Sequence, residues 1–517
     1  MSTVASIWLI ILALLGASSF RFQDERRKWA RLAFIVVASA FVVYSLVFIQ
    51  ARGGRLFKAQ SVLESDRAEI LLRLGTSIKV AEAKLLSMVG PLEGSASGHM
   101  LTEKDFHEEA STILEEDINK NPDSNLIKSK LVIVLGDSGR PQGKERLLKL
   151  AHELSLRKEP NESSLGKALL SIYGDTRVSL SSSLELSKVF VRELPPGWYR
   201  DATLLRLYKV AGETKQYNEL FTSIYDRAYR LFSNFVIVVS VGILASFIAF
   251  VVVVVQIFLL KRSSPREENE VAATDPVPWS LKTVYVVFVL WLLTQILVGS
   301  FSAGWMKSWG LLTSGALIAA VSTAALYLIS NGPAVLYAYL LAFKPYRVGF
   351  LEAIWLRAHI GKMGPFRLIL SGLLTWCVAV PTVMIAYLIA SRFFGSQGSS
   401  NPIIALVLEA ARSSNYMATA LFYITLGVLA PLCEETLFRG FLYRTLRNKF
   451  SVGTSLFVSA SIFALVHMDM GALVPLLCLG WLFGFVFERT KSLLPSIVAH
   501  GLWNSGTFTL VLMIFGT

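Results

Sequence analysis

The chain carries little charge and few cysteines. Asp, Glu, Lys and Arg make up 17% of its 517 residues, whereas 53% are hydrophobic and the mean hydropathy is +0.54. Because a typical soluble domain is about 25% charged, this composition argues against a soluble globular protein of this length. It predicts a protein that crosses a membrane several times.

Cysteine is too rare for a disulfide framework. The three cysteines, Cys377, Cys433 and Cys478, each lie in an apolar stretch, and no CxxC pair occurs. The sequence also lacks GxSxG and HExxH, the patterns of α/β-type serine hydrolases and of zinc peptidases. These absences leave thiolate metal sites and both of those hydrolase classes without support.

Positive charge is in excess, with 50 Lys and Arg against 37 Asp and Glu. The basic residues are scattered between hydrophobic stretches, as they are in the cytoplasmic loops of membrane proteins. The charge pattern therefore predicts a lipid bilayer, and no nucleic acid, as a partner of this chain.

Ten stretches approach the roughly 20 apolar residues that a spanning helix needs. The first has no basic region before it, which predicts a retained membrane anchor and not a cleaved signal peptide. The run AVLYAYLLAF (334–343) is shorter and is expected to be an interfacial helix. The ten candidates are 4–20, 32–50, 234–260, 282–303, 309–330, 366–394, 414–433, 452–470, 472–487 and 494–514.

Basic loops predict the orientation of these spans. With ten spans, the Lys/Arg-rich segments 21–31, 344–367, 443–449 and 488–491 all fall on one side, which we assign to the cytoplasm. The polar segment 51–232 then lies outside the cytoplasm.

An internal repeat runs through this polar segment. Gly136, Gly174 and Gly212 stand 38 residues apart, in LVIVLGDS, LSIYGDT and YKVAGET. Each unit is expected to be a helix, a turn that starts at the glycine and a second helix closed by proline, after a less complete unit with helices near 63–90 and 103–120. The pattern resembles tetratricopeptide (TPR) repeats, lengthened by a few residues, and predicts an α-solenoid that binds a protein partner. The alternative is a generic helical bundle whose glycines coincide.

The decapeptide PLCEETLFRG (431–440) places two glutamates and an arginine in an apolar region. Pro431 is expected to restart a helix, so that Glu434 and Glu435 lie near a first turn, where the helix dipole favours anions. Glu435 and Arg439 have the i,i+4 spacing of an ion pair, which leaves Glu434 to point elsewhere. Taken alone, the decapeptide is equally compatible with a juxtamembrane charge cluster.

Two of the six histidines lie inside predicted spans. His467 follows Phe463 by four residues, and His500 precedes Asn504 by four. A lone histidine in an apolar helix is more often a packing residue, but an ionisable group inside a membrane is a functional candidate by default. Three successive segments each supply one such group, and neither a serine nor a cysteine is placed as their nucleophile. An activated water is therefore the chemistry that the set suggests.

The sequences EETLFR (434–439), FALVH (463–467) and HGLWN (500–504) resemble the three motifs EExxxR, FxxxH and HxxxN of the CPBP family. This family of intramembrane proteases includes type II CAAX prenyl proteases and bacteriocin-processing relatives. The resemblance covers about 365–517 and implies an all-α polytopic membrane fold in a bacterial cytoplasmic membrane.

The resemblance also implies roles for individual residues. Glu434 would be the general base that activates water, assisted by His467, while His500 and Asn504 would polarise the scissile carbonyl and stabilise its oxyanion. Structural roles would belong to Glu435 and Arg439, as an orienting pair, and to Phe463, as a packing residue beside the site.

The use of a metal ion stays open at this stage. One carboxylate and two imidazoles, from Glu434, His467 and His500, could hold Zn²⁺ and leave a position for water. The family has been described both as metal-dependent and as glutamate-dependent. EExxxR supplies no local chelate, and Arg439 would compete with a cation, so we favour the glutamate mechanism.

These features predict an intramembrane endopeptidase that cleaves a membrane-anchored peptide or protein. The expected division is an N-terminal membrane hairpin (1–51), an extracytoplasmic TPR-like repeat domain (52–232), membrane helices with cytoplasmic linkers (233–364) and a peptidase domain (365–517). The alternative is a non-catalytic membrane scaffold or transport adaptor on the same fold. A secondary transporter would need inverted repeats, and no clear pair is present.

Overall fold

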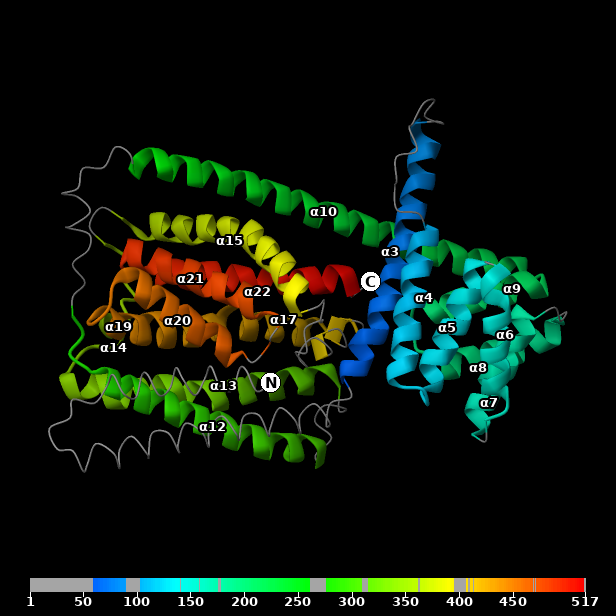
Figure 1. Ribbon diagram of the computed structural model, residues 1–517, viewed down its shortest axis with the longest axis horizontal. Coiled ribbons are helices and arrows are strands. Elements are labelled where there is room, and N and C mark those ends of the chain that lie inside the picture. Colours follow the sequence, from blue (N-terminus) through cyan, green and yellow to red (C-terminus); the bar gives the residue numbers. More distant parts are fainter. Residues whose placement is uncertain are drawn as a thin grey trace. The chain divides into compact units, whose positions relative to one another are not determined.

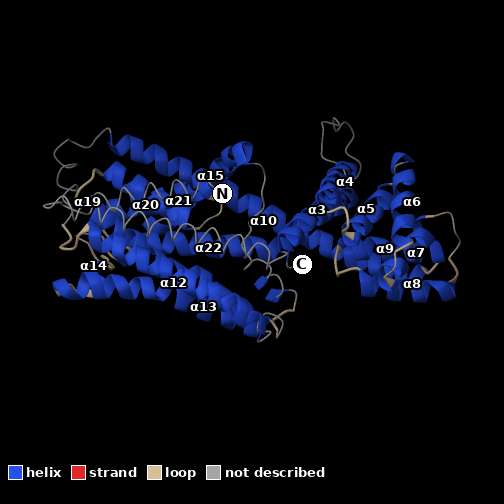
Figure 2. Cartoon of the chain, turned by 60° about the horizontal axis from the view of Figure 1, so that its bottom comes forward, coloured by secondary structure: helices blue, strands red, loops and turns tan. Residues whose placement is uncertain are grey.

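The computed structural model describes residues 59–89, 103–260 except 140, 158 and 175–177, 276–308, 315–394 except 361 and 362, and 406–515 except 408, 409, 412, 468 and 470. Every regular element within these ranges is a helix, apart from an isolated bridge between Ile360 and Met363 (Figure 2). The all-α prediction is therefore confirmed for the described residues. They divide into two compact units, one between 59 and 237 and the other chiefly between 238 and 512.

The first unit is a series of helices in which each, from α3 to α9, packs against the next. Helices α5, α7 and α9 also contact one another and form an inner row. Buried Leu131, Leu169 and Leu207, which share the 38-residue period, lie in this row. The helices are α3 (Ala59–Val89), α4 (Glu103–Lys120), α5 (Asn125–Ser138), α6 (Pro141–Ser155), α7 (Pro160–Tyr173), α8 (Leu180–Glu193), α9 (Trp198–Ala211) and the beginning of α10 (Thr214–Leu260).

The glycines of the repeat serve two different purposes. Gly174 and Gly212 follow the last residues of α7 and α9, as expected, and Gly212 has the left-handed φ of +73°. The expectation for Gly136 is wrong, because this glycine lies inside α5 and the turn comes at Gly139, with φ +62°. Close packing explains Gly136, since an added Cβ would stand 2.3 Å from the Tyr173 ring.

Changing Gly136 to alanine is expected to destabilise the first unit by about 1–3 kcal/mol, the usual range for overpacking. The Tyr173 ring would have to move for α5 and α7 to stay in contact. Hydrogen exchange of α5 and α7 in the full chain measures the effect. Gly143→Ala in α6 is the control, because its new Cβ would meet only the flexible Leu135 side chain, at 3.2 Å. Equal protection of both variants would contradict this explanation.

Helices α3 and α9, which are far apart in this series, are joined by hydrogen bonds. Trp198, at the start of α9, donates its backbone N–H to Glu69 Oε1 at 3.0 Å and its indole N–H to Thr76 Oγ1 at 3.1 Å. Both acceptors lie on α3, so α3 packs beside the third helix pair as well as beside α4. A TPR-like solenoid remains a prediction for this unit.

Six helices in the described residues are long and apolar enough to cross a membrane, which supports an integral membrane protein. They cover Thr214–Val255, Leu281–Gly299, Ala316–Tyr346, Pro365–Ala390, Tyr416–Arg447 and Leu473–Thr490. The number of ten spans is not confirmed. Two of the predicted spans, 4–20 and 32–50, lie outside the described residues, and two others correspond to α20 (Val452–Val466), which is shorter, and α22 (Leu494–Phe515), which carries His500 and Asn504.

The second unit is a bundle that contains the last five of these helices. In Figure 1, α12 (Leu281–Ser308), α13 (Ala316–Ala338), α15 (Pro365–Phe394), α21 (Leu473–Thr490) and α22 extend along similar directions. The helix 416–447 packs against α13 and α20, and its residues from Glu435 to Leu446 are buried on every face. A helix that is buried all round occupies the core of its bundle.

The prediction of a separate interfacial helix at 334–343 is wrong. Helix α13 continues through a π-helical turn, Tyr339–Phe343, and a 3-10 turn, Lys344–Tyr346, as one apolar segment. Pro333 is accommodated inside this helix. In an apolar environment the backbone groups must be paired within the segment, which favours continuation of a helix over a break.

The helix that carries PLCEETLFRG also continues without interruption from Tyr416 to Arg447. It comprises α17 (Tyr416–Ile424), a π turn (Thr425–Leu429), α18 (Ala430–Glu435), a π-helical stretch (Thr436–Tyr443) and α19 (Arg444–Arg447). The expectation that Pro431 restarts a helix is therefore wrong, and Glu434 and Glu435 lie in mid-helix. The wide turn before Pro431 lets the helix pass a residue that has no N–H to donate.

Candidate active site

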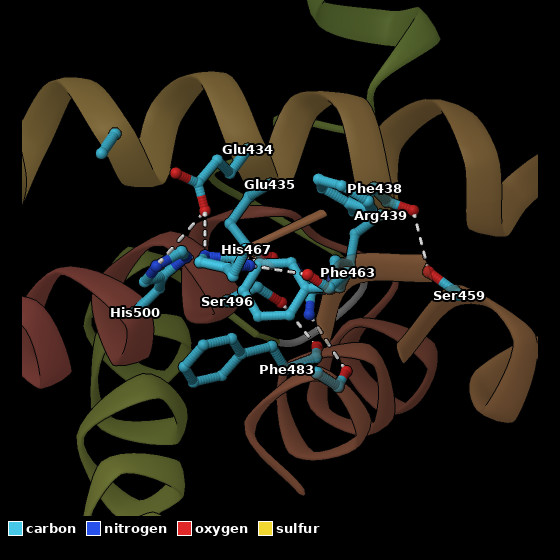
Figure 3. Close-up of polar contacts among 12 residues, drawn as sticks. Glu434, Glu435, Phe438, Arg439, Ser459, Phe463, His467, Phe483, Ser496 and His500 are labelled. Carbon is cyan, nitrogen blue, oxygen red and sulfur yellow. Dashed lines mark hydrogen bonds and ion pairs between the residues drawn. The ribbon is translucent and has the colours of Figure 1, made fainter. Parts of the chain in front are cut away.

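Three elements bring one carboxylate and two imidazoles together. Glu434 comes from α18, His467 from the end of α20 and His500 from α22. Glu434 Oε2 lies 3.9 Å from His467 Nε2 and 3.8 Å from His500 Nε2 (Figure 3). His500 is buried, Glu434 is half-buried and the His467 side chain is 33% exposed, so the three side chains meet at the edge of the buried core of the bundle.

The hydrogen bonds of the two imidazoles define which nitrogen faces Glu434. His467 Nδ1 lies 2.7 Å from the Phe463 carbonyl oxygen, which can only accept, so Nδ1 carries the hydrogen. His500 Nδ1 lies 2.8 Å from Glu435 Oε1 and donates to that carboxylate. Both rings therefore direct Nε2 toward Glu434.

The separations at Glu434 Oε2 are longer than about 3.5 Å, so neither imidazole bonds directly to this oxygen, and a water between them is the usual arrangement at such distances. This oxygen is buried and has no hydrogen-bond partner among the described residues. A carboxylate oxygen and two Nε2 atoms at these distances can surround one water molecule, which would donate its two hydrogens to two of these three acceptors.

Glu435 and Arg439 form a completely buried ion pair beside this group. Arg439 Nη1 donates to Glu435 Oε1 at 2.7 Å, and Nη2 donates to the Gly480 carbonyl at 3.0 Å. The guanidinium also lies over the Phe463 ring, 4.6 Å from its centroid. Because Glu435 Oε1 also accepts from His500, the ion pair fixes the orientation of that imidazole (Figure 3).

Asn504 compensates for the proline in the central helix. In the π turn, Ala430 N–H bonds to Thr425 O, so the next residue in this pattern, Pro431, would bond to Leu426 O. Proline has no N–H, and Asn504 Nδ2 donates to Leu426 O instead, at 2.9 Å. One amide hydrogen of Asn504 is thus used to join α22 to the central helix.

Glycines allow α22 to approach the central helix closely. A Cβ on Gly501 would stand 2.6 Å from the Gly427 carbonyl oxygen, and a Cβ on Gly427 would stand 2.3 Å from Ser505 Oγ. Gly501 lies between His500 and Asn504 in the sequence. Because these glycines have no side chain, the two helices can lie close enough for His500 to reach Glu435 and for Asn504 to reach Leu426.

Gly501→Ala is expected to lower the stability of the chain by about 1–3 kcal/mol, because a methyl group against a backbone carbonyl forces the two helices apart. The midpoint of thermal unfolding of the purified chain measures this loss. Gly506→Ala on the same helix is the control, since its new Cβ would meet only Trp376, at 3.9 Å. An equal midpoint for the two variants would show that the helices are not in such close contact.

The three side chains as placed do not fit a metal ion. No group of three or more His, Cys, Asp or Glu side chains in the described part of the chain is arranged to hold one. Ligands of tetrahedral zinc at 2.0–2.2 Å stand about 3.4 Å from one another, whereas Glu434 Oε2 is 3.9 and 3.8 Å from the two Nε2 atoms. The steps proposed below therefore involve only the side chains of the chain and water.

Two residues that contact the group were not singled out from the sequence. The Tyr327 hydroxyl, on α13, lies 3.3 Å from Glu434 Oε1, and the Phe483 ring, on α21, stacks on His500 with centroids 5.0 Å apart. Neither belongs to a motif with a fixed spacing. A tyrosine or phenylalanine in an apolar helix gives no sequence signal that separates it from a packing residue.

The site residues lie in a segment that matches a known protein family. Residues 416–506 match the family described as "Type II CAAX prenyl endopeptidase Rce1-like". The segment includes Glu434, His467, His500 and Asn504. No solved structure matches the chain.

Two curated bacterial proteins are similar to part of the chain. It is 29% identical to the Bacillus subtilis (strain 168) protein named "Putative membrane peptidase YdiL" over 127 residues, 23% of this chain and 51% of that protein. It is 31% identical to "UPF0177 protein YxdF" of Lactococcus lactis subsp. lactis (strain IL1403) over 80 residues, 15% of this chain and 44% of that protein. The chain thus spans about half the length of the curated relatives it matches. The matched segment is thus similar to membrane proteases of the CPBP type, and the apolar helices around it are those of a membrane protein.

Proposed function

We propose that the chain is an intramembrane endopeptidase that hydrolyses a peptide bond with a water activated at Glu434. The observation that carries the proposal is that the Nε2 atoms of His467 and His500 lie 3.9 and 3.8 Å from Glu434 Oε2 within a bundle of apolar helices. Ionisable side chains among apolar membrane helices cost free energy, so they are usually functional. Activation of a water molecule is a function that a carboxylate and two imidazoles can perform together.

The proposed hydrolysis assigns a role to each of these side chains. Glu434 takes one proton from the water, with assistance from His467, and the resulting hydroxide oxygen bonds to the carbonyl carbon of the substrate. The oxyanion receives a hydrogen bond from His500 Nε2 in its protonated form, whose charge the Glu435 carboxylate at Nδ1 stabilises. Asn504 contributes the amide hydrogen that is not used on Leu426. The C–N bond then breaks, and Glu434 returns its proton to the leaving amine.

The first unit would recruit the substrate or a protein partner. Paired helices that expose a long surface are typical of protein-binding repeats. In this proposal the repeat domain (52–232) lies outside the cytoplasm, between a membrane hairpin (1–51) and the remaining membrane helices (233–364), and the peptidase domain (365–517) lies in a bacterial cytoplasmic membrane. The substrate is a peptide or protein anchored in the same bilayer.

The proposal is tested by comparing protein N-termini in membranes from cells that carry the native chain and cells that carry Glu434→Gln at equal abundance. New N-termini that depend on Glu434 are expected. Identical profiles, combined with a phenotype on deletion of the whole chain, would instead support a non-catalytic scaffold.

A further inference from the structure

A tyrosine outside the matched segment contacts the proposed base. Tyr327 lies on α13, 107 residues before Glu434, and α13 packs against the central helix. Its hydroxyl lies 3.3 Å from Glu434 Oε1 and 3.5 Å from the Ala430 carbonyl oxygen. Of these two acceptors the carboxylate is nearer and charged, so it receives the stronger hydrogen bond.

This contact accounts for the oxygen of Glu434 that the imidazoles do not use. Tyr327 meets Oε1, whereas His467 and His500 face Oε2. Within the described residues, the Tyr327 hydroxyl is the donor of the hydrogen bond to the Glu434 side chain. A carboxylate held at one oxygen keeps its plane and presents the other oxygen in a constant direction.

Polar side chains around Tyr327 hold that turn of α13 in place. Ser330 Oγ and Asn331 Nδ2 both donate to the Tyr327 carbonyl oxygen, at 3.1 and 3.2 Å. Asn331 Oδ1 in turn accepts from Gln295 Nε2 on α12, at 2.9 Å. Hydrogen bonds between helices in an apolar bundle fix their relative positions, so Tyr327 is supported from two helices.

We propose that Tyr327 is a positioning residue of the peptidase site, which holds Glu434 Oε1 so that Oε2 stays directed at the water shared with His467 and His500. This inference rests on the proposed function. It extends the site from the matched segment 416–506 to α13.

The test uses the full chain in lipid bilayers and a peptide that contains a cleavage site found by the N-terminal comparison. Tyr327→Phe is expected to lower kcat roughly 10- to 100-fold, the range for a lost hydrogen bond to a charged group, with KM unchanged. Tyr337→Phe is the matched control, since this tyrosine of the same helix bonds to Thr294 Oγ1 at 3.0 Å and does not contact Glu434. It should keep the native kcat.

A double variant separates positioning from general packing. Because Tyr327 acts through Glu434, adding Tyr327→Phe to Glu434→Gln should cause little further loss of kcat. The proposal for Tyr327 would be overturned by a native kcat in Tyr327→Phe, by equal losses in Tyr327→Phe and Tyr337→Phe, or by a full additional loss in the double variant. Full cleavage by Glu434→Gln alone would overturn the proposed function itself, whatever the tyrosine variants show.

Discussion

Replacing Glu434 with glutamine is expected to reduce the rate of peptide cleavage by about 10²–10⁴-fold, the usual contribution of a general base. Glutamine keeps the size of the side chain and can still accept from Tyr327 at its carbonyl oxygen. It cannot take a proton from water at neutral pH, so the substrate should bind while the chemical step fails. The measurement is kcat and KM on a peptide substrate in reconstituted bilayers.

The adjacent Cys433→Ala variant is the control for Glu434→Gln. Successive helix positions point about 100° apart, and Cys433 is also the nearest thiol to the site in the sequence. Native activity in Cys433→Ala, together with loss in Glu434→Gln, assigns the chemistry to the carboxylate. The reverse pattern would indicate a thiol nucleophile and contradict the proposal.

Arg439→Ala is expected to cost about 3–5 kcal/mol of stability, because it leaves the Glu435 carboxylate buried without its cation. Both partners are fully buried, and Arg439 also bonds to the Gly480 carbonyl and lies over the Phe463 ring. The loss should be visible as a lower unfolding midpoint of the purified chain. Activity should fall as well, since Glu435 orients His500.

Two further variants give this prediction its controls. Arg367→Ala removes an exposed arginine at the start of α15 and should change the stability by less than about 0.5 kcal/mol. The double variant Glu435→Gln with Arg439→Met removes both charges and should recover much of the stability while remaining inactive. Equal midpoints for Arg439→Ala and Arg367→Ala would show that the pair does not stabilise the fold.

The sequence predicted which polar residues belong together because ionisable groups in apolar helices rarely face lipid. That reasoning singled out Glu434, His467 and His500, and the structure places the Nε2 atoms of both imidazoles within 4 Å of Glu434 Oε2. Spacing along the chain could not supply the orientation of each ring. The bonds from His467 to Phe463 and from His500 to Glu435 depend on helix packing.

Local helix geometry was harder to predict. Proline ordinarily marks the start of a helix, yet Pro431 lies within one because a π turn precedes it and a side chain from another helix, Asn504, bonds to Leu426. Neither compensation is visible in the local sequence. Similarly, Gly136 has the period of a turn glycine but serves the packing of α5 against Tyr173.

Hydrolysis by a water activated at Glu434 can be tested in a single-turnover reaction of the reconstituted chain with its substrate peptide in ¹⁸O-labelled water. We expect one ¹⁸O atom in the new carboxylate, no covalent adduct on the chain by intact mass, and product formation slowed about 10²–10⁴-fold by Glu434→Gln. Cleavage by Glu434→Gln at the native rate, or an acyl adduct on the native chain, would contradict hydrolysis by a water activated at Glu434.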